Sequence, residues 1–382
     1  MKVRIESVAH GGDGVARVDG KVMFVPGVMP SELVEVEVVR RGASFDRGRL
    51  VSILEPSSER ISPPCRHFGE CGGCDWQFAA YEAQLRWKTS TVRSQLEHIG
   101  GIVAEVRPCR EVGPRYGYRN RMDFEVVEGR LALTRPGRGG RLPLEMCLLG
   151  ASPIPEAVAE PVPFRGRVTL RVGIRTGEAV AVVSPPPRGE VEWRLPVLGP
   201  DEAVIHEEVA GHRFRIHGRA FFQVNTWGAE HLVDTVREAA EMSPGMRMLD
   251  GYAGVGLFSA TVGRDAEQVV AVESDPVAVR DLLANTQADV VEADMAVALR
   301  RLQDSFDIAV VDPPRQGLGR DVTALLGRSG CEVLVSVSCD PASFARDAAW
   351  LVAEGYQLEW VQPLDLFPQT HHVETVARFT RR

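Results

Sequence analysis

Short apolar stretches separated by glycine-containing turns dominate the first fifty-five residues of the chain. They predict five β-strands, at residues 3–9, 15–18, 21–25, 33–40 and 45–54. Asp19-Gly20 lies between two of them, and this dipeptide is typical of a tight hairpin turn. Five short strands favour an OB-like barrel over residues 1–56, a fold that often binds nucleic acid. The alternative is a barrel that only separates other domains.

The periodicity then changes along the chain. Residues 80–99 have apolar positions near helical spacing before Gly100-Gly101, whereas residues 116–220 alternate like β-strands. From His231 onward, helices alternate with apolar strands, which predicts a mainly parallel, doubly wound sheet. We therefore expect an α/β protein with three regions: the barrel at 1–56, a β-rich central region at 57–220 and a Rossmann-like domain at 221–382. The helix at 80–99 is expected to pack on the last region.

Composition narrows the class of protein. The chain has 44% hydrophobic and 25% charged residues, as soluble globular proteins do. It shows neither an apolar run of membrane-spanning length nor the apolar core of a signal peptide near Met1. We expect a cytoplasmic protein, by default a monomer, with reduced thiols. Clustered cysteines are then interpreted as ligands or catalysts.

Charge is unevenly distributed. The net charge of −8 argues against a protein that coats nucleic acid by bulk electrostatics. Residues 1–150 nevertheless contain 22 Lys and Arg against 19 Asp and Glu, and cations are densest from Arg107 to Arg141. Nearly all cations are arginines, which suit phosphate binding and base stacking. GC-rich coding produces the same bias, so composition alone gives only a hint of nucleic acid.

A glycine-containing turn follows a short apolar strand at residues 250–258. Its glycines allow a ligand to approach the backbone and the helix N-terminus. The next strand ends in Glu273, which can accept hydrogen bonds from both ribose hydroxyls of an adenosine ligand. The turn lacks the G-x-G-x-x-G order of NAD sites, and Asp294 ends a third unit. Acidic rims at Asp250, Glu273 and Asp312 suit the sulfonium cation of S-adenosylmethionine better than a pyrophosphate; an ordinary turn is the alternative.

Three cysteines lie close together in a turn-rich segment, at Cys65, Cys71 and Cys74. Thiolates at this spacing need a fourth ligand, which either Cys147 or Cys109 could supply. Zinc and a [4Fe–4S] cluster both bind four thiolates, and a tight trio with one distant cysteine favours the cluster. Three unligated thiols in such a polar segment would be prone to oxidation.

Polar turns also follow apolar strands in the last region. Cys339 comes after strand 333–337, Asp312 comes directly after strand 308–311, and Glu374 stands thirty-five residues past Cys339. Turns after neighbouring strands place their side chains along one edge of an α/β sheet, where such enzymes keep their active sites. A thiol and a carboxylate at that edge are a nucleophile and a base for covalent catalysis.

These motifs together resemble the RNA uracil-C5 methyltransferase family that uses S-adenosylmethionine, most of all its 23S rRNA 5-methyluridine members. The resemblance covers essentially the whole chain and rests on motifs at residues 221–225, 250–258, 312–317, 338–341 and 367–374. The barrel resembles the TRAM domain of this family. Ala253, Leu257 and Ser343 depart from the family pattern, where Cys, Asn and Thr are usual. These departures concern the cofactor pocket rather than the reaction.

The resemblance assigns roles to individual residues. It implies that Cys339 adds to carbon 6 of uracil and that Glu374 accepts the proton from carbon 5. It implies that S-adenosylmethionine is bound by Gln223, Tyr252, Glu273, Asp294 and Asp312, and that a [4Fe–4S] cluster is held by Cys65, Cys71, Cys74 and Cys147. RNA is the implied partner, held by the barrel and the arginine-rich segment, and its target uridine has to be unstacked.

Three other interpretations compete with this one. A tRNA uridine methyltransferase would use the same chemistry, so the catalytic residues do not distinguish it from an rRNA enzyme. A non-catalytic RNA-binding protein would have no need of both Cys339 and Glu374. A radical S-adenosylmethionine enzyme usually has a C-x3-C-x2-C motif, whereas five residues separate Cys65 from Cys71 here.

Overall fold

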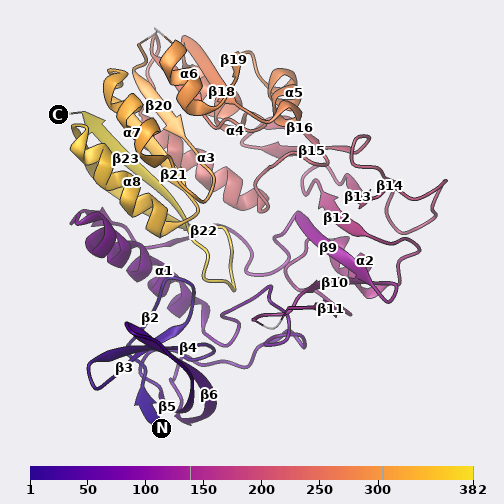
Figure 1. The fold of residues 1–382 in the computed structure, drawn as a ribbon. Helices are drawn as coiled ribbons and strands as arrows, with labels where there is room; N and C mark the ends of the chain where they lie inside the picture. The colour runs from indigo at the N-terminus through magenta and orange to yellow at the C-terminus, as the bar shows by residue number, and fades with distance from the viewer. Residues whose placement is uncertain (138, 303–304, 382) are drawn as a thin grey trace.

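The chain forms a barrel, a central β-sheet and a larger α/β unit in a computed structural model (Figure 1). The structure describes residues 1–137, 139–302 and 305–381. Arg138 of the arginine-rich segment lies outside these ranges. No helix in the described ranges is both long and apolar enough to cross a membrane.

The barrel is a six-stranded sheet with the order β1-β5-β6-β4-β3-β2. The first predicted strand is divided in two, because the backbone N–H of Ile5 turns to the carbonyl of Glu32 while that of Glu6 bonds to Val15. Alternate apolar side chains from these strands fill the interior. The strands are β1 (Lys2–Arg4), β2 (Ser7–Val8), β3 (Gly14–Val18), β4 (Lys21–Val25), β5 (Leu33–Arg41) and β6 (Phe45–Glu55).

A helix connects the barrel to the α/β unit. Helix α1 (Tyr81–Gln95) continues as a π-helical turn, η1 (Leu96–Gly100), and ends at Gly101 in the left-handed region with φ 62°. Val92 and Leu96 on its buried face share a hydrophobic core with Phe344 of the α/β unit. The strands that follow, β7 (Glu105–Val106) and β8 (Arg110–Glu111), both pair with strand β22 of that unit. Residues 81–111 therefore pack on the α/β unit.

The central sheet has the order β11-β10-β9-β12-β13-β14 and one short covering helix. A separate hairpin, β15–β16, follows it and packs against helix α5 of the α/β unit. The elements are β9 (Arg121–Val127), β10 (Arg130–Thr134), β11 (Arg141–Pro143), α2 (Ile154–Ala159), β12 (Arg167–Val172), β13 (Ala179–Ser184), β14 (Val197–Leu198), β15 (Val204–Val209) and β16 (His212–His217).

The α/β unit is built on a sheet with the order β19-β18-β17-β20-β21-β23-β22-β7, with β8 beside β22. The five neighbouring strands β19, β18, β17, β20 and β21 are parallel, and β23 runs antiparallel to β21. Its strands are β17 (Arg247–Gly251), β18 (Gln268–Glu273), β19 (Asp289–Glu292), β20 (Ile308–Val311), β21 (Val333–Ser338), β22 (Tyr356–Asp365) and β23 (Glu374–Arg381). Its helices are α3 (Thr226–Ala240), α4 (Leu257–Thr261), η2 (Gly263–Asp265), α5 (Pro276–Asn285), α6 (Met295–Arg301), α7 (Gly319–Arg328) and α8 (Pro341–Ala353).

Both faces of this sheet are covered, which explains why its strands are nearly continuous apolar runs. Val310 and Val335 face a core shared with helix α3, whereas Ala309 and Leu334 face a core shared with α1, α7 and α8. Figure 1 shows these helices around the sheet. The side chains at the carboxyl ends of the parallel strands are left as the accessible polar edge.

Candidate active site

Strand register brings Cys339 and Glu374 to the same edge of the sheet. Ser338 at the end of β21 pairs with Thr375 of β23. Because β23 is antiparallel, the residue that follows Ser338, Cys339, lies across the ladder from the residue that precedes Thr375, Glu374. Asp312 follows β20, the other neighbour of β21. Two of the three side chains therefore follow parallel strands, whereas Glu374 reaches the edge by beginning an antiparallel one.

Burial raises the pKa of each acid in this group. Burial raises the pKa of the Cys339 thiol to about 12, the nearby carboxyls of Glu374 and Asp312 add to the shift, and Arg315 opposes it. Burial likewise raises the pKa of Glu374 well above its ordinary value, Asp312 adds to this shift and Arg315 opposes it. A cationic ligand placed here would favour the ionised forms.

Asp250, at the end of β17, carries an unsatisfied buried oxygen. Its Oδ2 accepts hydrogen bonds from the N–H of Ser259 at 2.8 Å and from the Ser259 hydroxyl at 2.5 Å. Its Oδ1 has no partner among the described residues, and burial raises the pKa of the carboxyl to about 7. A buried, unpaired carboxylate oxygen is costly unless a ligand satisfies it, and a cation does so best.

The other predicted cofactor residues lie around the same edge, but they do not all line one cavity. Tyr252 and Asp294 line a cavity of about 480 Å³ beside Pro314. Glu273 lies outside its lining and accepts hydrogen bonds from three backbone N–H groups, including that of Gly254 at 2.8 Å, so it organises the glycine turn. Gln223 also lies outside the lining; it is buried, and its backbone carbonyl accepts a hydrogen bond from Asn120.

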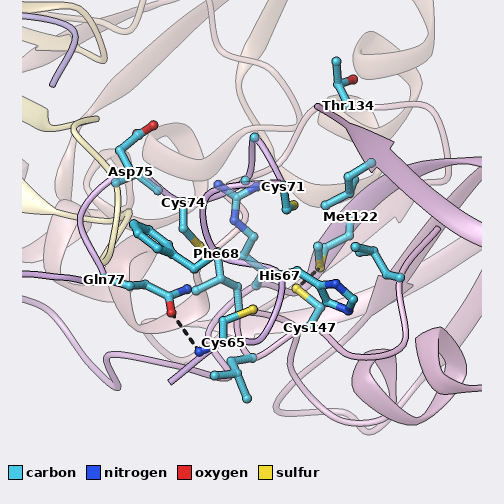
Figure 2. Close-up of a pocket in the computed structure, with 18 of the residues that line it drawn as sticks. Cys65, His67, Phe68, Cys71, Cys74, Asp75, Gln77, Met122, Thr134 and Cys147 are labelled. Atoms are coloured by element: carbon cyan, nitrogen blue, oxygen red, sulfur yellow. Dashed lines mark hydrogen bonds between the residues drawn. The ribbon is translucent and has the colours of Figure 1, made fainter. Parts of the chain in front are cut away.

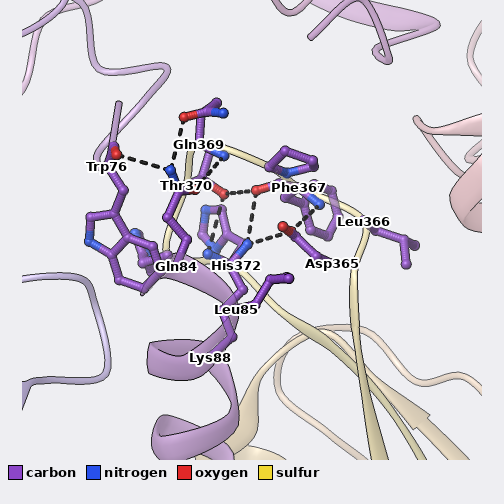
Figure 3. A network of polar contacts seen from close by, with 12 residues as sticks. Trp76, Gln84, Leu85, Lys88, Asp365, Leu366, Phe367, Gln369, Thr370 and His372 are labelled. Carbon is purple, nitrogen blue, oxygen red and sulfur yellow. Dashed lines mark hydrogen bonds and ion pairs between the residues drawn. The ribbon is translucent and has the colours of Figure 1, made fainter. Parts of the chain in front are cut away.

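The loop that precedes Glu374 is anchored by helix α1 (Figure 3). Lys88 is fully buried, and its Nζ atom lies 2.5 Å from Oδ1 of Asp365. The same ammonium group donates a hydrogen bond to the carbonyl oxygen of Phe367 at 3.1 Å. Gln84 exchanges two hydrogen bonds with Gln369, at 3.1 and 3.0 Å. Gln369 has a left-handed backbone, with φ 71°, so its turn depends on these contacts.

Sequence reasoning missed this anchor, although a signal for it existed. Lys88 is one of three lysines in the chain and occupies a position of α1 at which helical spacing calls for an apolar residue. A lysine at such a position needs a buried partner. Asp365 is separated from it by hundreds of residues, so the pairing was visible only in the fold.

Four cysteines line a second cavity, of about 340 Å³ (Figure 2). They are Cys65, Cys71, Cys74 and Cys147. Cys109, the other candidate for a fourth ligand, is buried in the core beneath α1, where its backbone N–H bonds to Thr89. Among the described residues, no three His, Cys, Asp or Glu side chains are grouped as a single metal ion would require.

Burial raises the pKa of three of these thiols, Cys71, Cys74 and Cys147. Burial raises the pKa of Cys147, but hydrogen bonds from the backbone N–H groups of Leu149 and Gly150 oppose this shift. Arg119 lines the same cavity, attracts the ionised Cys147 sulfur and has a buried Nε without a partner in the described part of the chain. Backbone donors and a guanidinium are what a negatively charged thiolate cluster needs.

The parallel sheet, its glycine turn and its acidic edge define an S-adenosylmethionine-dependent methyltransferase domain. The family model for tRNA (uracil-5-)-methyltransferases matches residues 201–382, and the TRAM domain model matches residues 1–51. An uncharacterized RNA methyltransferase of Thermosynechococcus vestitus is 32% identical over 100% of this chain and 98% of its own length. One of Streptomyces coelicolor is 34% identical over 98% of this chain and 92% of its own.

A solved structure extends the likeness to three dimensions. The tRNA (uracil-54, C5)-methyltransferase of Pyrococcus abyssi, in complex with S-adenosyl-L-homocysteine, has a TM-score of 0.76 and 26% sequence identity to this chain. The likeness covers 100% of this chain and 99% of that one. The chain therefore belongs to the tRNA (uracil-5-)-methyltransferase family and is an RNA methyltransferase with an N-terminal TRAM domain.

Proposed function

We propose that this enzyme methylates carbon 5 of a uridine in 23S ribosomal RNA by covalent catalysis. The observation that carries the proposal is the register that sets Cys339 opposite Glu374, with Asp312 on the neighbouring strand. A nucleophile and a proton acceptor at one edge are what carbon 5 methylation requires, because this carbon is a poor nucleophile until a group adds to carbon 6.

The reaction follows from these side chains. The Cys339 thiolate forms a bond to carbon 6, and the displaced electron pair makes an enolate that is nucleophilic at carbon 5. Carbon 5 takes the methyl group of S-adenosylmethionine, and S-adenosylhomocysteine leaves. The Glu374 carboxylate then accepts the carbon 5 proton, and the electron pair of that C–H bond restores the double bond as the Cys339 sulfur leaves. Because burial raises the pKa of Glu374, its carboxylate is a stronger base than that of an exposed glutamate.

The methyl donor fits the acidic edge described above. The unpaired Oδ1 of Asp250 would face a cationic part of the donor, and Tyr252 and Asp294 would border its adenosine end. Glu273 is proposed to accept the ribose hydroxyls, Asp312 to position the donor and the uracil edge, and Gln223 to complete the site. The target uridine has to leave its stack to reach Cys339.

The second cavity is proposed to hold a [4Fe–4S] cluster on Cys65, Cys71, Cys74 and Cys147. Such a cluster would supply a rigid four-thiolate crosslink between the segment 65–74 and the central sheet, with a structural or RNA-orienting role. Arg119 would offset its negative charge. Measuring iron and acid-labile sulfide in anaerobically purified protein tests this: about four of each per chain are expected, and zinc without sulfide would contradict it.

Transfer RNA is a second candidate substrate, favoured by the full-length likeness to the Pyrococcus abyssi tRNA enzyme. Mass-spectrometric mapping of 5-methyluridine in tRNA and 23S rRNA from cells lacking the protein distinguishes the two. Loss of one 5-methyluridine from 23S rRNA is expected; loss from tRNA alone would select the second candidate.

The chemistry is tested with purified protein, radiolabelled S-adenosylmethionine and the RNA so identified. Cys339→Ala should lower methyl transfer by at least roughly 10⁴-fold, because no other group forms the bond to carbon 6. Cys331→Ala is the matched control, since this buried thiol bonds to the carbonyl of Val333 away from the edge. Full turnover by Cys339→Ala would refute covalent catalysis by this residue.

A further inference from the structure

A loop of the barrel reaches the turn that carries the nucleophile. His10, between β2 and β3, lines a cavity of about 90 Å³ together with Cys339, Arg315 and His371. The Nε2 atom of His10 lies 3.2 Å from Oδ2 of Asp340, the residue next to Cys339. A side chain from the N-terminal domain is therefore part of the surroundings of a nucleophile near the C-terminus.

Gly12 of this loop is in close contact with residues of the neighbouring domains. Gly12 has a φ of 92°, and a Cβ atom there would lie 3.1 Å from the Cβ of His371 and 3.3 Å from Nε1 of Trp76. The indole N–H of Trp76 donates a hydrogen bond to the carbonyl of Gly12 at 3.1 Å. Glycine is thus favoured at this position by its backbone conformation and by the close approach of these side chains.

The two carboxylate oxygens of Asp340 contact different partners. Oδ1 accepts the backbone N–H of Ser343 at 2.7 Å and so caps helix α8, while Oδ2 faces His10. Burial opposes ionisation of Asp340, yet the hydrogen bonds from His10 and Ser343 hold its pKa below the ordinary value. The Asp340 carboxylate therefore fixes the helix N-terminus on one side and the barrel on the other.

We propose that His10 is a positioning residue for the nucleophile: by holding Asp340 it fixes the turn that directs Cys339 toward the uracil. The barrel then completes the active site, whatever contacts it also makes with RNA. The assignment of a catalytic effect rests on the proposed function, in which Cys339 is the nucleophile.

The first test needs neither RNA nor turnover. Hydrogen–deuterium exchange on the full chain compares the wild type with His10→Ala. Amides in the peptide spanning residues 338–345 should exchange at least roughly threefold faster in the variant, while those at the end of α8 near Ala353 stay unchanged. His98→Ala is the control, because this exposed histidine has hydrogen bonds to Ser94 of the same helical segment and no other among the described residues. Unchanged exchange at 338–345 would overturn the proposal.

The second test separates positioning from RNA binding. At saturating RNA, kcat of His10→Ala should fall roughly tenfold, with less than a twofold change in the Kd for RNA. His10→Gln, which keeps an N–H donor at similar reach, should recover most of the loss. If only Kd or KM rises, His10 is an RNA contact and the proposal is wrong. If the wild type itself transfers no methyl group, the proposed function fails, and the exchange measurement still decides whether His10 holds the turn.

Discussion

Cys339 and the four cysteines of the second cavity are the same chemical group in opposite surroundings. Burial raises the pKa of the Cys339 thiol, and the neighbouring carboxyls of Glu374 and Asp312 add to the shift. Burial also raises the pKa of Cys147, but there the neighbouring backbone N–H groups and Arg119 oppose the shift. The comparison teaches that burial alone does not assign a cysteine its role; the charge and hydrogen-bonding direction of its neighbours do.

The cavity with the four cysteines and the cavity beside Cys339 share lining residues. His371 and His372 line both the cavity with the four cysteines and the cavity beside Cys339. These histidines belong to the loop that α1 anchors and that ends at Glu374. Oδ2 of Asp75, the residue after Cys74, lies 2.6 Å from Nδ1 of His371. The contact is a hydrogen bond when the imidazole is neutral and an ion pair when it is protonated. The four thiols of the second cavity and the thiol of Cys339 are therefore connected through a few residues.

The sharpest test of the catalytic side is Glu374→Gln. The amide keeps the shape of the side chain but cannot accept the carbon 5 proton, so the covalent RNA adduct should accumulate and turnover should fall by roughly 10³-fold or more. A slow-migrating protein–RNA band on a denaturing gel, with the mass of a methylated adduct, measures this. Glu359→Gln, on the exposed side of β22, is the control. Lost turnover without an adduct would place Glu374 before methyl transfer.

The proposed cluster ligand Cys147 is tested by comparing the Cys147→Ser and Cys109→Ser variants. Replacing Cys147 should remove most of the iron bound to the purified protein, because one of four thiolates is lost. Replacing Cys109 should leave the iron content unchanged, since this thiol lies in the core beneath α1. Iron and sulfide analysis gives the result directly, and equal losses in both variants would contradict the assignment of Cys147.

The anchoring of the loop that carries His371 and His372 is tested by Lys88→Met. The change leaves the buried Asp365 carboxylate without its cationic partner, although the Tyr81 hydroxyl and the Phe367 N–H still donate to it. The free energy of unfolding should fall by about 3–5 kcal/mol. Denaturant titration measures this. Arg86→Met, which breaks an exposed ion pair with Glu59, should cost less than about 1 kcal/mol. A double variant, Lys88→Met with Asp365→Asn, removes both charges and keeps an acceptor for the Tyr81 hydroxyl, so it should regain much of the loss. Failure to do so would indicate that the charge pair is not the anchor.

The smallest effect concerns pH. Burial raises the pKa of Asp250 from 3.8 to about 7, so the folded protein binds this proton more tightly than the unfolded chain does. Its stabilising contribution is full below about pH 4 and is lost as the pH rises through about 7, by a few kcal/mol at most. The Tm of ligand-free protein should therefore decline over this window, and Asp250→Asn should flatten the decline. An identical pH dependence in both proteins would contradict the assignment.

Local patterns accounted for most of the secondary structure. The strand at 308–311 appears with the bounds that its apolar run predicts, and β18 ends at Glu273 as expected. Alternation did not reveal that the first barrel strand breaks at Ile5, since that break follows a bond to Glu32. Periodicity also could not show that β7 and β8 join the far end of the large sheet, because two-residue strands carry no pattern of their own.

The sequence by itself determined the chemistry available to this protein: the thiol of Cys339, the carboxylate of Glu374, the glycine turn and the spaced cysteines. Only the tertiary structure decided which of these groups meet. The antiparallel direction of β23 sets Glu374 beside Cys339, and the packing of α1 leaves Cys109 in the core while Cys147 reaches the other three thiols. The same holds for His10, which meets Asp340 through docking of the barrel. The physical reason is that residue type is a local property, whereas proximity depends on strand direction and helix packing over long separations in sequence.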